Sequence, residues 1–357
     1  MKVEEQQQLA SKPLIGTVIA VQANYYQVKL DVQQPERLPL LLCTRRALLK
    51  KMGQKVMVGD RVEVVEPDWA GGRGAISHVL PRHTELDRPP VANAQQILLV
   101  FALEEPKLEP YQLSRFLIKA ETTGLEVRLY LNKSDLLTPE QLLHWQLRLR
   151  QWGYDPVFIS VHLAAIEQIR AQLDNKITVV AGPSGVGKSS LINHLIPTAN
   201  LRTSEVSGKL GRGRHTTRHV ELFQLPSGGL LADTPGFNQP DLDCEPEELV
   251  NYFPEARERL AVAHCQFNDC SHRDEPNCVV RGDWERYEHY LEFLAEATIR
   301  ATLQGRTSNL EANMKLKSKR GKTQYEPKLE TKKYRRTSRR SQQQGLQKLD
   351  EDGEAQS

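Results

Sequence analysis

The sequence predicts a multi-domain protein: an N-terminal β-barrel, a central parallel α/β domain, a mostly helical region and a basic tail. Three observations predict this order. Short strand patterns fill roughly the first eighty residues, strand and helix patterns alternate in the middle, and three of five cysteines fall within fourteen positions. A length of 357 residues allows two or three domains. We place the boundaries at residues 1–85, 86–244, 245–304 and 305–357.

Composition excludes several classes of protein. Hydrophobic residues make up 39% of the chain and charged residues 26%, values typical of soluble proteins. No apolar run is long enough to span a bilayer, and the first residues lack the apolar stretch of a secretory signal. We therefore expect a cytoplasmic protein with no membrane partner, and a monomer.

The first domain reads as about five short strands without a convincing helix. Turn residues such as Ala23-Asn24 and Gly71-Gly72 separate these strands. This pattern predicts a small closed barrel, and the oligonucleotide-binding (OB) barrel is one such fold. The alternative is a barrel that only packs against its neighbour.

The central domain alternates strands and helices, the pattern of a parallel sheet covered by helices on both faces. A helix over 110–124 is closed by Gly124, and the next begins with Thr138 as cap and Pro139 at its first position. The expected strands are residues 94–103, 126–132, 156–160, 176–182 and 228–233.

A phosphate-binding loop follows the strand at 176–182 and opens a helix, which is the context that the motif requires. It matches G-x-x-x-x-G-K-[ST] in full, and its nucleotide-binding residues are Gly182, Ser184, Gly185, Val186, Gly187, Lys188, Ser189 and Ser190. Converging backbone N–H groups bind phosphate there. We expect Lys188 to reach the β- and γ-phosphates and the Ser189 hydroxyl to bind Mg²⁺.

A D-x-x-G motif, Asp233 to Gly236, ends the strand at 228–233, about fifty residues after the phosphate loop. An aspartate at that point can hold the Mg²⁺ shell through water, and the Gly236 N–H can meet the γ-phosphate. The motif is weak alone and strong at this spacing.

A guanine-reading motif, Asn132-Lys133-Ser134-Asp135, ends the strand at 126–132. The Asp135 carboxylate can accept the N1–H and N2–H groups of guanine, an edge that adenine does not present. We expect Lys133 to lie along the ring, Asn132 to tie this loop to the phosphate loop, and Ser160 to contact the guanine carbonyl. Alone, the motif would more often be a helix-capping turn; its presence disfavours a phosphate-loop ATPase or kinase.

The guanine motif precedes the phosphate loop, the reverse of the usual order in guanine-nucleotide enzymes. Parallel strands all end at one edge of a sheet, so a circular permutation leaves the pocket intact. The permutation sends the segment after Gly236 into the cysteine-rich region. We hypothesise that residues 237–250 transmit the nucleotide state to that region.

The motif order resembles the circularly permuted ribosome small subunit-dependent GTPase A (RsgA) family, over about residues 14–300. The resemblance implies hydrolysis of GTP to GDP and phosphate with Mg²⁺, stimulated by the small (30S) ribosomal subunit. It also implies binding to that subunit and its rRNA late in maturation. The alternative is a non-catalytic RNA-binding assembly protein with a nucleotide-ordered switch.

Residues 204–222 occupy the first switch position. By resemblance, Thr217 caps Mg²⁺ and senses the γ-phosphate; the alternative is a threonine that only starts a strand. Ras-like enzymes orient water with a glutamine after D-x-x-G, whereas Phe237 stands there and cannot hydrogen-bond water. The family's switch histidine matches His215, which we expect to act with Thr217 and Lys188 in catalysis. A solvated loop histidine is the competing interpretation.

The cysteine cluster offers three thiolates and one imidazole, from Cys265, Cys270, His272 and Cys278. That donor set suits one tetrahedral, structural Zn²⁺. The alternatives are buried cysteines without metal, or His264 as the imidazole ligand. Cys43 and Cys244 are expected to be ordinary residues.

The tail carries the chain's positive charge. Residues 315–340 hold twelve Lys or Arg against two Glu, although the net charge of the whole chain is only +3. With few apolar residues, the tail is expected to be disordered when free. Its charge, with Tyr325 and Tyr334, suits RNA phosphate contact; a merely solvated tail is the alternative.

Overall fold

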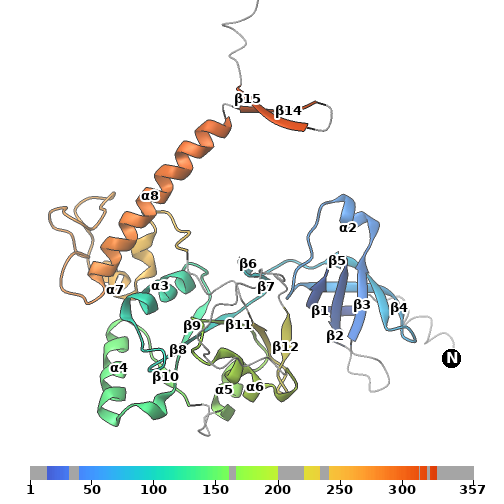
Figure 1. Ribbon diagram of the computed structural model, residues 1–357, viewed down its shortest axis with the longest axis horizontal. Helices are drawn as coiled ribbons and strands as arrows, with labels where there is room; N and C mark the ends of the chain where they lie inside the picture. The colour runs from blue at the N-terminus through green and yellow to red at the C-terminus, as the bar shows by residue number, and fades with distance from the viewer. Residues whose placement is uncertain are drawn as a thin grey trace, which may run out of the picture. The chain divides into compact units, whose positions relative to one another are not determined.

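The computed structural model describes residues 14–31, 40–160, 166–199, 221–233, 241–312, 314–319 and 322–327. The chain divides into two compact units, Met1–Ala295 and Glu296–Ser357. The barrel, the α/β sheet and the cysteine cluster all belong to the first unit (Figure 1). Among the described helices, none has the length and apolar character needed to cross a bilayer.

The predicted closed barrel is confirmed (Figure 1). Its strand order is β1-β2-β3-β5-β4, with β3 and β5 parallel and the other pairs antiparallel. The strands are β1 (Leu14–Gln22), β2 (Tyr25–Leu30), β3 (Leu40–Arg45), β4 (Arg61–Asp68) and β5 (Arg73–Val79). A short helix that the sequence did not predict, α2 (Ala47–Lys51), follows β3. It buries only Leu49 and is too short to show a helical period.

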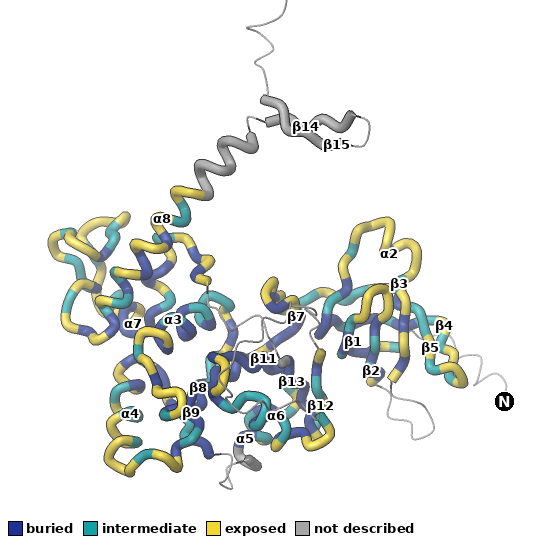
Figure 2. Tube along the Cα trace, in the orientation of Figure 1, coloured by how far each residue is buried: buried dark blue, intermediate teal, exposed yellow. Residues whose placement is uncertain are grey.

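The central domain is built on a six-stranded sheet of order β10-β9-β8-β11-β13-β12. Its strands are β8 (Gln96–Ala102), β9 (Glu126–Asn132), β10 (Val157–Phe158), β11 (Ile177–Ala181), β12 (Leu222–Gln224) and β13 (Leu230–Asp233). All neighbouring pairs are parallel except β12–β13. Every residue of β8 is buried, as expected for a strand covered on both faces (Figure 2). The predicted parallel α/β pattern is confirmed, with one antiparallel edge strand added.

Helices connect these strands as the sequence predicts. They are α3 (Pro110–Glu121), η1 (Ser134–Leu136), α4 (Pro139–Gln151), α5 (Ile166–Leu173), α6 (Lys188–Leu195) and η2 (Pro197–Ala199). Thr138 caps α4 through a reciprocal capping box with Gln141, which fixes where the helix begins after the guanine motif. A small hairpin of β6 (Glu85–Asp87) and β7 (Pro90–Ala92) precedes β8.

The cysteine-rich region is mostly helical, as predicted, with η4 (Leu249–Tyr252), α7 (Pro254–Val262) and α8 (Tyr287–Ala312). We call residues 241–295 the helical domain. Its own core includes Phe253, Tyr290 and Phe293, and Ile118 of α3 packs into the same cluster.

Helix α8 continues beyond residue 304, where we expected the helical domain to end. A hairpin of β14 (Met314–Lys319) and β15 (Lys322–Pro327) follows, inside the segment that we expected to lack structure. Extending a formed helix costs little in a stretch containing Ala, Leu and Glu, so Gly305 does not stop it. The rest of the tail, from residue 328, lies outside the described residues.

Candidate functional site

The phosphate loop connects the buried strand β11 to helix α6. Gly182 has φ 139°, and a Cβ there would lie 2.0 Å from the Val100 carbonyl oxygen. Gly187 has φ 97°, and a Cβ there would lie 2.3 Å from Asn132 Nδ2. Both positions therefore require glycine, for backbone conformation as well as for space. Lys188 Nζ donates to the Gly182 and Pro183 carbonyl oxygens at 2.8 and 2.6 Å, so its ammonium lies over the loop.

The guanine motif is bonded to the phosphate loop through one side chain. Asn132 ends β9 and is 1% exposed, and its Nδ2 donates to the Val186 carbonyl at 2.8 Å. Asn132 Oδ1 is buried and lacks a hydrogen-bond partner among the described residues. The next residue, Lys133, has φ 60°, and the following Ser134 N–H donates to Ile159. One buried amide thus joins two loops that lie more than fifty residues apart.

The two motifs line a single cavity of about 610 Å³. Asn132, Lys133, Asp135 and Ser160 contribute from one side, and Gly187 and Ser190 from the start of α6. Ser160 is 3% exposed, and it follows β10, which pairs with β9. Because β9, β10 and β11 are parallel, the loops after them share one edge of the sheet.

Four further residues line this cavity that the sequence analysis did not single out: Glu105, Leu136, Asn193 and His194. No motif marks them. Glu105 stands just beyond β8, however, and the loop after any strand of a parallel sheet borders the crevice. That topological rule is the signal that would have found it.

Only some of the candidate Mg²⁺-binding and switch residues lie within the described part of the chain. Asp233 ends β13, where it pairs with Val180 of β11 at the edge that carries the phosphate loop. His215, Thr217 and Gly236 lie outside the described residues, as does Phe237. Their expected roles therefore stay predictions.

The four metal-ligand candidates converge: the donor atoms of Cys265, Cys270, His272 and Cys278 all lie within 4.8 Å of one another. Cys265 Sγ lies 3.5 Å from His272 Nδ1 and 3.9 Å from Cys278 Sγ, and His272 Nδ1 lies 3.4 Å from Cys278 Sγ. Ligand atoms around a tetrahedral zinc stand roughly 3.5–3.8 Å apart, so the cluster fits that ion. His264 does not belong to the cluster.

Burial and hydrogen bonds hold the cluster in this arrangement. Burial lowers the pKa of His272, which favours the neutral imidazole that binds metal. Burial also raises the pKa of Cys270 to about 12, so a thiolate there needs a cation beside it. The Tyr287 and Tyr290 hydroxyls donate to the carbonyls of His272 and Ser271 at 2.8 and 2.9 Å. These two bonds from the first turn of α8 fix the backbone that carries the ligands.

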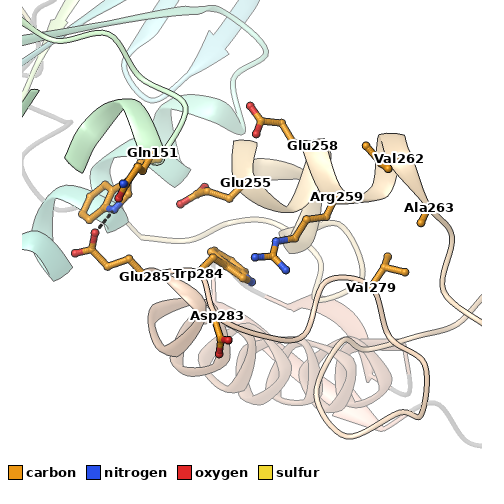
Figure 3. A pocket seen from close by; sticks show the side chains of 11 residues that line it. Gln151, Glu255, Glu258, Arg259, Val262, Ala263, Val279, Asp283, Trp284 and Glu285 are labelled. Atoms are coloured by element: carbon orange, nitrogen blue, oxygen red, sulfur yellow. Dashed lines mark hydrogen bonds between the residues drawn. The ribbon is translucent and has the colours of Figure 1, made fainter. Parts of the chain in front are cut away.

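A second cavity, of about 670 Å³, lies where α4 meets the helical domain (Figure 3). Its lining includes Gln151 and Trp152 at the end of α4, Glu258 and Arg259 of α7, and Asp283 and Trp284 before α8. Among the described residues, its lining shares none with the first cavity and includes no glycine. Volume alone therefore does not identify the nucleotide site.

Comparison with known proteins agrees with this geometry. The model of the RsgA GTPase family matches residues 79–243. A Nostoc protein named small ribosomal subunit biogenesis GTPase RsgA 1 is 68% identical, covering 94% of this chain and 96% of its own length. The chain belongs to the RsgA GTPase family. It is therefore an enzyme that hydrolyses GTP, which rules out the ATPase and kinase alternatives.

Other RsgA relatives support the same assignment. A Synechocystis relative of the same name is 55% identical over 93% of this chain and 94% of its own. The crystal structure of YjeQ from Thermotoga maritima matches with a TM-score of 0.68 and 32% identity, covering 80% of this chain and 99% of that one. YloQ, described as a circularly permuted GTPase, matches with a TM-score of 0.68 and 31% identity, covering 82% and 97%. The permuted fold that the motif order predicts is thereby confirmed.

Proposed function

We propose that this chain binds the small ribosomal subunit in its GTP form during late maturation and leaves after hydrolysis. The observation that carries this function is the single cavity shared by Asp135, Ser160, Gly187 and Ser190. The name of the Nostoc relative supports the ribosomal role. GTP bound in this cavity is the substrate. Its γ-phosphate favours the conformation of the protein that has the higher affinity for the subunit.

The base end of the cavity recognises guanine. The Asp135 carboxylate accepts the N1–H and one N2–H, and the backbone beside Ser160 meets the carbonyl at C6. Lys133 lies along the ring with its aliphatic stem. Asn132 contacts the phosphate loop directly, so base and phosphate binding are coupled through one hydrogen bond. Adenine would leave Asp135 facing no donor.

The phosphate end uses backbone N–H groups from Gly182 to Ser190, an arrangement that the two crowded glycines support. Lys188 is already over the loop and would move onto the β- and γ-phosphates. Mg²⁺ would be held by Ser189 and Thr217, and by Asp233 through water. The β11–β13 register places Asp233 at the same edge as Ser189's loop, which suits that ligand set. Gly236 would meet the γ-phosphate.

Hydrolysis by the chain alone is expected to be slow. Phe237 replaces the water-orienting glutamine, so we assign that role to His215, with Thr217 sensing the γ-phosphate. An imidazole can orient or deprotonate water near neutral pH. Binding to the subunit would place His215 correctly, which makes turnover depend on the partner.

Zinc would hold the helical domain together rather than take part in the reaction. Cys265, Cys270, His272 and Cys278 would supply four protein ligands to the ion, which would leave no position for a substrate. The barrel and the basic tail are the proposed rRNA contacts, since phosphate binding needs cationic or oligonucleotide-binding surface. We propose a cytoplasmic monomer.

The decisive experiment measures GTP turnover with and without purified small ribosomal subunits. The proposal predicts slow hydrolysis alone and at least about tenfold faster hydrolysis with subunits, since oriented general bases contribute 10²–10⁴-fold. His215→Ala should keep GTP binding and lose the stimulation. Turnover that is unchanged by subunits would contradict the proposed dependence of hydrolysis on the partner.

A further inference from the structure

The loop between β8 and α3, residues 103–109, reaches the nucleotide cavity through Glu105. Lys133 of the guanine motif also lines the cavity, and its Nζ donates a hydrogen bond to the main-chain carbonyl of Glu105. This bond links two segments that are both at the carboxyl edge of the sheet. The ammonium of Lys133 is therefore anchored at a fixed point.

The Glu105 carbonyl is held in place by buried neighbours. Leu103 is 1% exposed, and its N–H donates to the Asn132 carbonyl at 3.0 Å. Leu108 is 3% exposed, and its N–H donates back to the Leu103 carbonyl at 3.1 Å. The loop is thus closed on itself and fastened to the guanine motif, so the position of its apex does not depend on the exposed Glu105 side chain.

Both partners of the hydrogen bond adopt left-handed backbone conformations. Glu105 has φ 52° and Lys133 has φ 60°. Such conformations are unfavourable for residues other than glycine, and they persist only where the surroundings enforce them. Here the left-handed conformation of Glu105 directs its carbonyl toward the Lys133 ammonium.

We propose that Glu105 is a positioning residue of the base pocket, which acts through its carbonyl by fixing Lys133 beside the purine. This inference rests on the proposed guanine site. The stem of Lys133 is apolar and contacts any purine, whereas Asp135 reads the groups that distinguish guanine. Loss of the Glu105 anchor therefore weakens all purine nucleotides alike and leaves the choice among them unchanged.

The test uses substitutions that separate the backbone of Glu105 from its charge. Valine is β-branched and disfavours a positive φ, so Glu105→Val moves the carbonyl away. Glycine and asparagine accept the left-handed conformation, so Glu105→Gly and Glu105→Asn keep the carbonyl in place without the carboxylate. Glu104→Val, one residue earlier and outside the cavity lining, is the matched control.

Dissociation constants for GDP and IDP (which lacks the 2-amino group) are measured on the full-length chain. Glu105→Val is expected to weaken both by the same factor, about fivefold, which corresponds to the loss of one hydrogen bond. Glu105→Asn and Glu105→Gly should bind close to wild type, as should Glu104→Val. Asn and Gly variants weakened as much as Val would overturn the proposal, because the carboxylate would then be the active group.

A double variant checks that Glu105 acts through Lys133. Lys133→Met removes the ammonium and keeps the stem length, so adding Glu105→Val to it should cause no further loss. A second, additive fivefold loss would contradict the proposal. Failure of this proposal can be told apart from failure of the proposed guanine site. If the guanine site were wrong, the wild-type chain would bind GDP and ADP with equal affinity.

Discussion

The central domain is joined to its two neighbours by different kinds of contact. On the barrel side the contacts are mainly main-chain and apolar: Ala92 N–H donates to the Val58 carbonyl at 2.8 Å, and Ala20 bridges Glu221 beside β12. The neutral side chain of Asn93 also donates to the Gly59 carbonyl at 3.0 Å. Val58 belongs to the core of the central domain, and Ile19 and Val21 of β1 pack against it. This junction depends on backbone shape.

On the side of the helical domain, charged side chains bond across the junction in addition to apolar contacts such as that of Ile118. Arg286 is fully buried and pairs with Glu255 of the same domain, and it reaches across the junction to Trp152: its guanidinium carbon lies 4.8 Å from the ring centroid and its Nη2 donates to the carbonyl. Glu285 pairs with Arg148 and accepts from the Trp152 indole at 2.8 Å. Charged pairs are direction-specific and expensive to break when buried. The two junctions should therefore fail under different changes, and each of the following predictions tests that difference.

Zinc removal is expected to have the largest effect, confined to the helical domain. Structural zinc contributes on the order of 10 kcal/mol to folding in small zinc domains. A chelator should release one zinc per chain and lower the melting temperature, while protease resistance of the barrel stays intact. Cys278→Ser should lower the zinc content, whereas Cys244→Ser, which replaces a thiol buried outside the cluster, should not. Equal zinc loss in both variants would contradict the ligand assignment.

Arg286→Ala is the next largest perturbation. It leaves Glu255 buried without its counter-charge, which costs about 3–5 kcal/mol of unfolding free energy. Urea denaturation followed by tryptophan fluorescence measures the loss, since Trp152 and Trp284 both lie at this junction. Arg257→Ala is the control: in its pair with Glu121 the Arg257 side chain is 47% exposed, so its loss should cost below about 1 kcal/mol. Similar losses for both variants would mean that burial does not set the strength of this junction.

Gly59→Ala attacks the barrel junction instead. Gly59 has φ 88°, and an added Cβ would lie 2.0 Å from the Ala92 carbonyl oxygen. We expect a destabilisation of about 1–3 kcal/mol, with new protease cleavage near residues 80–95. Gly72→Ala also requires a positive φ, 61°, but meets nothing within 4 Å, so it should cost less. If the two glycine variants behaved alike, close approach of the barrel to β7 would not matter.

Salt is expected to produce the smallest effect, again on the helical side. The Lys119–Asp243 pair, at 2.8 Å, is partly exposed on Asp243, so added salt screens it. Lys119→Ala should cost about 0.2–1 kcal/mol at low ionic strength and nearly nothing at 1 M salt. In the same salt series, the loss of unfolding free energy caused by Gly59→Ala should stay unchanged.

Motif chemistry predicted from the sequence which residues come together in the candidate nucleotide cavity and in the candidate zinc cluster. Local geometry requires glycine at 182 and 187, and the donor atoms of three cysteines and His272 lie together, so these residue types could be recognised in the sequence. The edge of the sheet that carries the pocket was equally predictable, because parallel strands all end on one side.

Contacts between distant segments could not be predicted from the residue types. The Glu105 carbonyl that holds Lys133 is a main-chain atom, and any residue type carries one. Arg286 reads as a surface charge in a helix-rich stretch, and only the packing of Trp152 and Phe253 around it shows that it is buried. Helix α2 is a single turn, too short for any periodic pattern.

Exchange of the base specificity tests the convergence of the two motifs most directly. Binding of GDP and XDP, in which a carbonyl replaces the 2-amino group, is measured for the wild-type chain and for Asp135→Asn. We predict that the wild type prefers GDP. The amide of Asp135→Asn can donate to that carbonyl, so the ratio of XDP affinity to GDP affinity should rise by about a hundredfold from wild type to variant. An Asp135→Asn variant that keeps full preference for GDP would show that Asp135 and the phosphate loop do not share one nucleotide.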